Sequence, residues 1–135
     1  MALIHWNDEL NTGIPSIDSQ HRRLIELVDI LDREVQSRAD ANAVACVLTE
    51  LMSYANTHFA NEESLMIACG YPGLRKHRLE HDAFSQRLRV LLARYVAGTT
   101  GIDREILVAL RNWFVDHVSV TDAAYVPALR AFCAA

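Results

Sequence analysis

Residues 17–35 read IDSQHRRLIELVDILDREV, and the spacing of their apolar residues indicates the class of fold. Its apolar residues and one histidine recur alternately four and three positions apart, which places them on one side of an α-helix. The members of this stripe are Ile17, His21, Leu24, Val28, Leu31 and Val35. An amphipathic helix of this kind buries its apolar side against other helices, so the stretch predicts a helical bundle.

Three further segments carry the same helical spacing and are separated by turn signals. One runs over about 42–69 and ends at Gly-Tyr-Pro-Gly in 70–73, where Gly and Pro both end helices. The next runs over about 74–97, and the last over about 103–126. Since the connections are short, neighbouring helices should run antiparallel, in up-down-up-down order.

The segment before the first helix lacks helical spacing. Residues 1–16 contain Trp6, Gly13 and Pro15, and we expect an N-terminal arm laid across the bundle. Asp18 is a good N-cap residue, so the first helix is expected over about 18–38. The predicted fold is all-α: an antiparallel four-helix bundle with an N-terminal arm, forming a single domain over 1–135.

Composition excludes several classes of function. The chain has 135 residues, of which 51% are hydrophobic, and a net charge of −4, which gives no reason to expect nucleic acid as a partner. No apolar run approaches the roughly 18–20 residues of a membrane span, so no membrane insertion is expected. The three cysteines form no Cys-x-x-Cys pair, and the N-terminus does not resemble a signal peptide. We therefore expect a cytoplasmic location.

Five of the six histidines and two carboxylates form one set of candidate metal ligands. The set is His21, His58, Glu62, His77, His81, His117 and Asp122. All but Asp122 fall on stripes expected to face the core. Each buried polar group without a partner costs roughly 1–3 kcal/mol, and a whole domain is stable by only about 5–15 kcal/mol. A metal centre would satisfy the whole set, and seven ligands suit two metal ions.

The spacing within two helices brings ligands together in pairs. His58 and Glu62, like His77 and His81, are four residues apart and lie on one helix face, roughly 6 Å from each other. Imidazole suits iron, zinc or copper, and carboxylates readily bridge two metals. A zinc site would need only three or four ligands and leave the others unexplained. The mixed set favours a non-haem di-iron centre.

The spacing of the last two ligands does not fit a regular α-helix. Asp122 lies five residues after His117, which places it about 140° around the helix. Both side chains reach one centre only if the helix loosens between them, for instance through a π-turn. We therefore predict that residues 117–122 are not a plain α-helical turn.

Taken together, these motifs resemble the hemerythrin family, in particular its single-domain bacterial members, the bacteriohemerythrins. The matching pieces span almost the whole chain and are Trp6, Gly13-Ile14-Pro15-x-Ile17-Asp18-x-Gln20-His21, His58-Phe59-x-x-Glu62-Glu63, Gly70-Tyr71-Pro72, His77-x-x-x-His81 and Trp113-x-x-x-His117-x-x-x-x-Asp122. The resemblance implies two iron ions bridged by two carboxylates and an oxo or hydroxo group. The implied ligands are His77, His81 and His117 for one iron, His21 and His58 for the other, and Glu62 and Asp122 as bridges.

The resemblance also implies a pocket for O2 beside the iron that has only two histidines. Its walls would be Leu24, Phe59, Trp113, Phe114 and Val118. Phe114 stands where the family usually has Leu, and Val118 where it usually has Ile. The apolar lining would keep water from the bound O2 and so preserve reversibility.

Reversible O2 binding, for carriage, storage or delivery to an oxygen-using enzyme, is the function this resemblance implies. An O2 or redox sensor acting through a signalling partner, and a di-iron enzyme handling peroxide or nitric oxide, are the alternatives. Enzymatic bundles that activate O2 typically carry paired Glu-x-x-His motifs, and this chain has none, so we expect no enzyme.

Three residues near these motifs have weaker assignments. His5 lies in the arm and is expected to stay away from the metal. Glu63 is expected on a solvated face or in a hydrogen bond to a ligand. Tyr125 would either contact the site from outside the ligand set or simply pack near the helix end.

Overall fold

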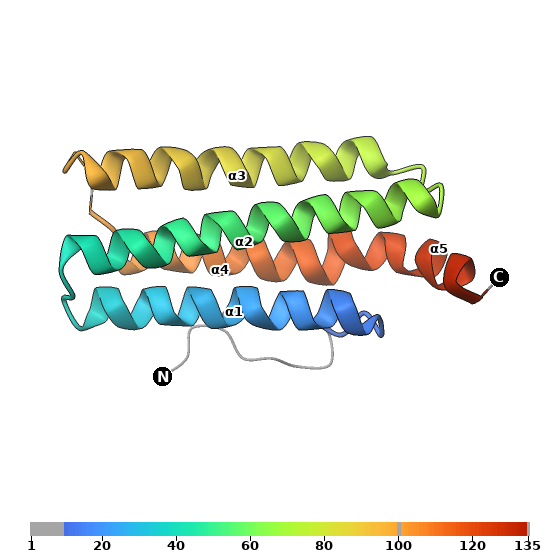
Figure 1. The fold of residues 1–135 in the computed structure, drawn as a ribbon, viewed down its shortest axis with the longest axis horizontal. Coiled ribbons are helices and arrows are strands. Elements are labelled where there is room, and N and C mark those ends of the chain that lie inside the picture. The colour runs from blue at the N-terminus through green and yellow to red at the C-terminus, as the bar shows by residue number, and fades with distance from the viewer. Residues whose placement is uncertain (1–9, 100, 135) are drawn as a thin grey trace.

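The computed structural model describes residues 10–99 and 101–134, and within these residues it is helical and contains no strand. The elements are α1 (Pro15–Gln36), α2 (Ala41–Ala68), α3 (Leu74–Val96), α4 (Arg104–Asp116), the π-helix η2 (His117–Asp122) and α5 (Ala123–Ala134). The first four helices lie side by side, and α5 continues past one end of the bundle (Figure 1). α2 packs against both α1 and α3, and α4 packs against α1. The predicted antiparallel four-helix bundle is confirmed.

Local sequence signals set most helix ends. The carboxylates of Asp40 and Asp103 accept backbone N–H groups of Ala43 and Ile106 at 2.9 Å, and they cap α2 and α4. α2 ends beside Gly70, whose φ of 67° few other residues adopt readily. The N-cap Asp40 and the helix-ending Gly70 therefore give α2 nearly the length predicted from the sequence.

The start of α1 differs from the prediction. The helix begins at Pro15, with Ile14 as the N-cap, so residues 15 and 16 do not belong to an arm and Asp18 is not the cap. Proline suits the first helical position because its fixed φ is helical and its missing N–H has no partner there anyway. Asp18 instead accepts hydrogen bonds from the backbone N–H and hydroxyl of Thr12, at 2.9 and 2.8 Å. The predictions for His5 and Trp6 lie outside the described residues.

The last helix is longer than predicted. It was expected to end near residue 126, but α5 continues to Ala134 with Pro127 inside it. A proline within a helix removes one backbone hydrogen bond and costs about 3 kcal/mol. Tyr125 and Leu129 are fully buried and pack with Met66, and the burial of large side chains contributes about 1.5–3 kcal/mol each. The free energy gained by packing these side chains therefore outweighs the cost of the proline.

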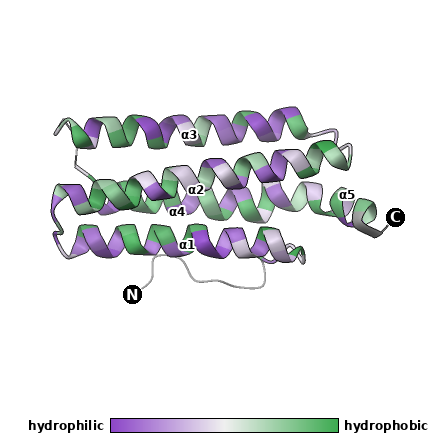
Figure 2. Ribbon diagram, viewed as in Figure 1, coloured by the Kyte–Doolittle hydropathy of each residue, from purple (hydrophilic) through white to green (hydrophobic). Residues whose placement is uncertain are grey.

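Hydrophobic and hydrophilic residues are interspersed along every helix (Figure 2). Most of the buried apolar side chains form one large cluster, which contains Leu24, Leu48 and Leu88. A smaller cluster around Met66 and Tyr125 lies toward α5. Along α3, His77 and His81 lie between Leu74, which packs against the smaller cluster, and Phe84 of the larger one. None of the helices in the described part of the chain has both the length and the apolar character needed to cross a bilayer.

Candidate metal centre

All seven candidate ligands are buried and meet in the middle of the bundle. Their potential donor atoms form two groups, within each of which all atoms lie within 4.8 Å of one another. The larger group is His77, His81 and His117 with Glu62 and Asp122, and the smaller is His21 and His58 with the same two carboxylates. Each group can hold one metal ion, and the shared carboxylates lie between them.

Asp122 faces both groups through different oxygens. Its Oδ1 lies 2.8 Å from Nε2 of His77 and 3.0 Å from Nε2 of His117. Its Oδ2 lies 3.0 Å from Nε2 of His21. A carboxylate placed in this way can give one oxygen to each of two cations.

A π-helix brings Asp122 to this position. Residues His117–Asp122 form the single π-helical segment among the described residues, as the spacing of the two ligands predicted. The hydroxyl of Ser119 donates to the backbone carbonyl of Val115 at 2.7 Å, a contact that often bends helices. Val120 lies on the outer side with 69% of its surface exposed. The residue by which the π-helical turn exceeds an α-helical turn thus faces solvent, while His117 and Asp122 both point inward.

Glu62 also contacts both groups. Its Oε1 lies 2.9 Å from Nε2 of His58 and 3.4 Å from Nε2 of His81. Its Oε2 accepts a hydrogen bond from the buried hydroxyl of Tyr125 at 2.7 Å. Tyr125 therefore contacts the site from outside the ligand set, which is the first of the two alternatives considered from the sequence.

Residues outside the ligand set orient two of the histidines. Nδ1 of His81 lies 2.9 Å from Oε2 of Glu63 and donates to it, because an ionised carboxylate only accepts. Nδ1 of His58 lies 2.6 Å from Oε1 of Gln20. Both contacts turn the Nε2 side of the ring toward the centre. Glu63 makes the hydrogen bond that was one of its two expected roles, whereas Gln20 was not singled out.

Several polar atoms at the centre lack hydrogen-bond partners among the described residues. They are both nitrogens of His21, Nε2 of His77, Oε1 of Glu62 and both carboxylate oxygens of Asp122. Although some of these atoms lie within about 3 Å of each other, their alignment is not that of hydrogen bonds. In addition, Nε2 of His81 and Nε2 of His117 face each other at 3.0 Å. Buried polar atoms without partners are costly, and cations held between these residues would take one nitrogen of each histidine and the carboxylate oxygens as ligands.

The charge of the centre also suits cations. Burial raises the pKa of Asp122, but the imidazoles of His117, His21 and His77 outweigh this effect and hold the pKa well below its ordinary value. Burial and the charge of Asp122 raise the pKa of Glu62, but His58 and His81 leave it lowered overall. Both carboxylates are therefore ionised at neutral pH. Five imidazoles with two carboxylates form a nitrogen-rich donor set that suits iron and related transition metals.

Two aromatic rings cover the three-histidine group. The ring of Phe59 stacks on His81, with centroids 4.0 Å apart and planes at 11°. The indole of Trp113 stacks on His117 at 4.5 Å and again at 11°. These stacks hold the two imidazoles in place and exclude water from one side of each ring.

A third ring lies beside the two-histidine group. Phe114 is buried, and its ring centroid is 5.8 Å from that of His21, in an edge contact. Leu24 and Val118 are buried within the same apolar cluster, at 3% and 2% exposure. Of the predicted lining residues, Phe114 thus lies beside the two-histidine group, whereas the rings of Phe59 and Trp113 stack on histidines of the three-histidine group. The role of the five residues as the walls of an O2 pocket stays a prediction.

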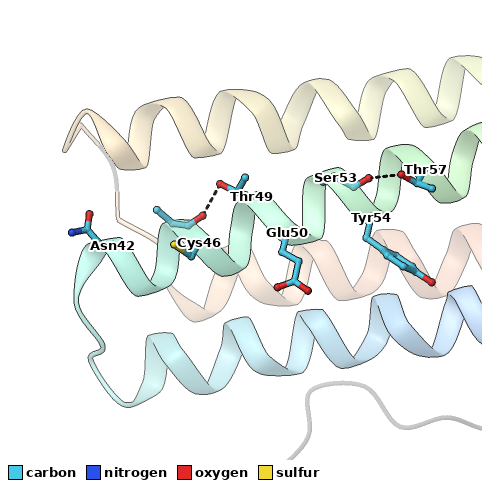
Figure 3. Close-up of a pocket in the computed structure, with 8 residues that line it drawn as sticks. Asn42, Cys46, Thr49, Glu50, Ser53, Tyr54 and Thr57 are labelled. Atoms are coloured by element: carbon cyan, nitrogen blue, oxygen red, sulfur yellow. Dashed lines mark hydrogen bonds between the residues drawn. The ribbon is translucent and has the colours of Figure 1, made fainter.

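A surface pocket lies along α2 (Figure 3). Its lining residues are Asn42, Ala45, Cys46, Thr49, Glu50, Ser53, Tyr54 and Thr57. The hydroxyls of Thr49 and Thr57 turn back and donate to carbonyls of α2 itself. The lining of this pocket contains none of the seven candidate ligands.

Fold and site together define a metal-binding four-helix bundle. Residues 12–129 match the sequence profile of the hemerythrin HHE cation binding domain. The match covers most of the chain, and the protein therefore belongs to the hemerythrin family.

Similar proteins and structures agree with this assignment. A bacteriohemerythrin of Pseudomonas paraeruginosa strain PA7 is 39% identical over 130 residues, which cover 96% of this chain and 84% of that protein. A bacteriohemerythrin of Methylococcus capsulatus strain Bath is 28% identical over 97% of this chain and 100% of its own length. The crystal structure of a wild-type hemerythrin superposes with a TM-score of 0.89 at 27% identity, covering 95% of this chain and 98% of that one.

Proposed function

We propose that this protein binds O2 reversibly at a pair of iron ions held by the buried centre. The proposal rests on one observation above all: two histidine groups of unequal size share the same two carboxylates. The residues that would hold the ions are His77, His81 and His117 on one side, His21 and His58 on the other, and Glu62 and Asp122 between them. When bound, the two ions supply electrons to O2 and a free coordination position on the iron with fewer histidines.

The protein's own contribution is to fix these ligands and keep the centre dry. Asp122 and Glu62 reach both groups from fixed positions, since η2 directs the first and Tyr125 holds the second. Phe114 lies against His21, which belongs to the group with only two histidines. Excluding water there limits proton access, which would otherwise leave the irons oxidised and end the cycle.

Carriage, storage and delivery of O2 all draw on this chemistry. Delivery would require an oxygen-using enzyme as a partner, and sensing would require a signalling protein. The absence of paired Glu-x-x-His motifs from the sequence favours binding over O2 activation, and we propose a binding protein rather than an enzyme.

Repeated exposure to air tests the proposal. Apoprotein is loaded anaerobically with iron(II), exposed to air and then stripped of oxygen, while the visible spectrum is recorded. We expect charge-transfer bands that appear and disappear fully over several cycles. Glu50→Gln, on the outer side of α2, serves as the control and should cycle normally, whereas His58→Ala should not. Bands that persist after oxygen is removed, or rapid turnover of added peroxide, would contradict reversible binding.

A further inference from the structure

The histidines of the larger group have charged partners behind them. Nδ1 of His81 donates to Glu63 at 2.9 Å. Nδ1 of His117 lies 3.5 Å from Oε2 of Glu80, which is too long for a hydrogen bond but close enough for attraction. Two of the three imidazoles on this side therefore have a carboxylate on the side away from the metal position.

The histidines of the smaller group have no such charge. Nδ1 of His58 contacts the amide oxygen of Gln20, which is neutral and also accepts a hydrogen bond from Asn61 at 3.2 Å. Nδ1 of His21 is buried and has no hydrogen-bond partner among the described residues. The two groups share both bridging carboxylates, so these outer partners are a principal electrostatic difference between them.

Arg78 fixes the charge of Glu63 in place. Its Nε donates to Oε1 of Glu63 at 2.9 Å, while the other oxygen faces His81. The side chain of Arg78 is 48% exposed and that of Glu63 only 19%, so solvent screens the arginine more than the carboxylate. The carboxylate also lies nearer the imidazole, and its effect on the ring outweighs that of its partner.

We propose that Glu63 and Gln20 act as positioning residues that make the two iron sites electronically unequal. A carboxylate that accepts the Nδ1 proton makes the imidazole a stronger donor, which favours iron(III) on the three-histidine side. The neutral amide leaves the two-histidine iron poorer in electrons and so easier to reduce. The inference rests on the proposed function, because it concerns the irons that this centre would hold.

The expected size of the effect follows from other residues that hydrogen-bond a metal ligand. Replacing such a residue changes metal affinity by about 10–100-fold. If the carboxylate favours iron(III) over iron(II) by the lower figure, the potential of that iron differs by about 59 mV for one electron. Such a shift is measurable by redox titration followed in the visible spectrum.

Reciprocal exchange of the two partners tests the proposal. The di-iron form should be reduced in two one-electron steps, first at the two-histidine iron and then at the three-histidine iron. Glu63→Gln should raise the reduction potential of the second step by about 59 mV, which corresponds to a tenfold change in the equilibrium constant. Gln20→Glu should lower the reduction potential of the first step. Each variant should therefore reduce the difference between the two potentials, the first by raising the lower potential and the second by lowering the higher one. Arg78→Gln, which removes the countercharge of Glu63, should lower the potential of the second step and increase the difference between the two potentials.

Glu50→Gln is the matched control, because Glu50 of α2 also pairs with an arginine, Arg23 of α1, but contacts no ligand histidine in the described part of the chain. It should leave both steps unchanged. A Glu63→Gln protein that keeps both irons and has wild-type potentials, or that moves both steps equally, would overturn the inference while leaving the proposed function intact. If Glu63→Gln does not retain iron, an unshifted second step in Arg78→Gln overturns it. Wild-type protein without two irons would instead refute the proposed function.

Discussion

Replacing Tyr125 with phenylalanine tests how the centre holds its carboxylates. The substitution removes one hydroxyl group, which donates to Oε2 of Glu62 at 2.7 Å. The ring itself remains, with its edge contacts to His77 at 5.5 Å and to Tyr71 at 6.3 Å. Tyr125 is fully buried, so no water replaces the lost donor without displacing protein atoms. The loss of stability therefore reports the hydrogen bond rather than packing.

The size of this loss follows from the charge and burial of the pair. A hydrogen bond to a charged group contributes about 1.5–3 kcal/mol. The entropy of unfolding is about 2.1 cal/mol/K per residue, or about 0.28 kcal/mol/K for a chain of 135 residues. Tyr125→Phe should therefore lower the melting temperature by about 5–11 °C. Metal affinity should also fall, by about 10–100-fold, because Glu62 is less firmly held.

Thermal unfolding of metal-free protein, followed by circular dichroism, measures the effect. Tyr71→Phe is the control, because Tyr71 is an adjacent, half-buried tyrosine of the same small cluster and its hydroxyl donates to none of the candidate ligands in the described part of the chain. It should change stability by no more than about 0.5 kcal/mol. If Tyr125→Phe melts with the wild-type protein and the control, the hydroxyl does not stabilise Glu62 and the reasoning is wrong.

Three other perturbations test separate parts of the structure. Asp18→Ala removes the hydrogen bonds that hold the loop before α1, and denaturant unfolding should show a loss of about 1–3 kcal/mol; an unchanged midpoint would contradict that role. Phe114→Ala should cost about 3–5 kcal/mol and speed autoxidation in stopped-flow spectra, since water then reaches the centre; a wild-type autoxidation rate would refute its role in excluding water. Deleting the exposed Val120 leaves Asp122 four residues after His117, which suits a regular α-helix, so both irons should be retained. Loss of iron in that variant would show that the π-helix does more than absorb one residue.

Much of the fold was predictable because it follows from spacing within single helices. The stripe in residues 17–35 gave the buried side of α1, and pairs four residues apart gave neighbouring ligands on α2 and α3. The five-residue step from His117 to Asp122 predicted the π-helix, because no regular helix directs both side chains to one place. These inferences need only the geometry of one helix.

Features that depend on distances between elements were not predictable in the same way. Gln20 on α1 and His58 on α2 are far apart in the sequence and meet only once the helices pack. Asp18 has the chemistry of an N-cap, but the bonds it makes depend on how the loop before α1 folds back. The continuation of α5 through Pro127 likewise depends on burial, which a local rule for proline does not include.

The metal content of the purified protein shows whether the two groups of ligands form one centre for two metal ions. Elemental analysis by mass spectrometry, after loading with iron(II) and removal of unbound metal, should give two iron ions per chain, one for each group of ligands. Asp122→Ala should reduce this number, because its two oxygens face both groups. A single zinc ion per chain, or two irons retained equally well without Asp122, would contradict a centre built on two shared carboxylates.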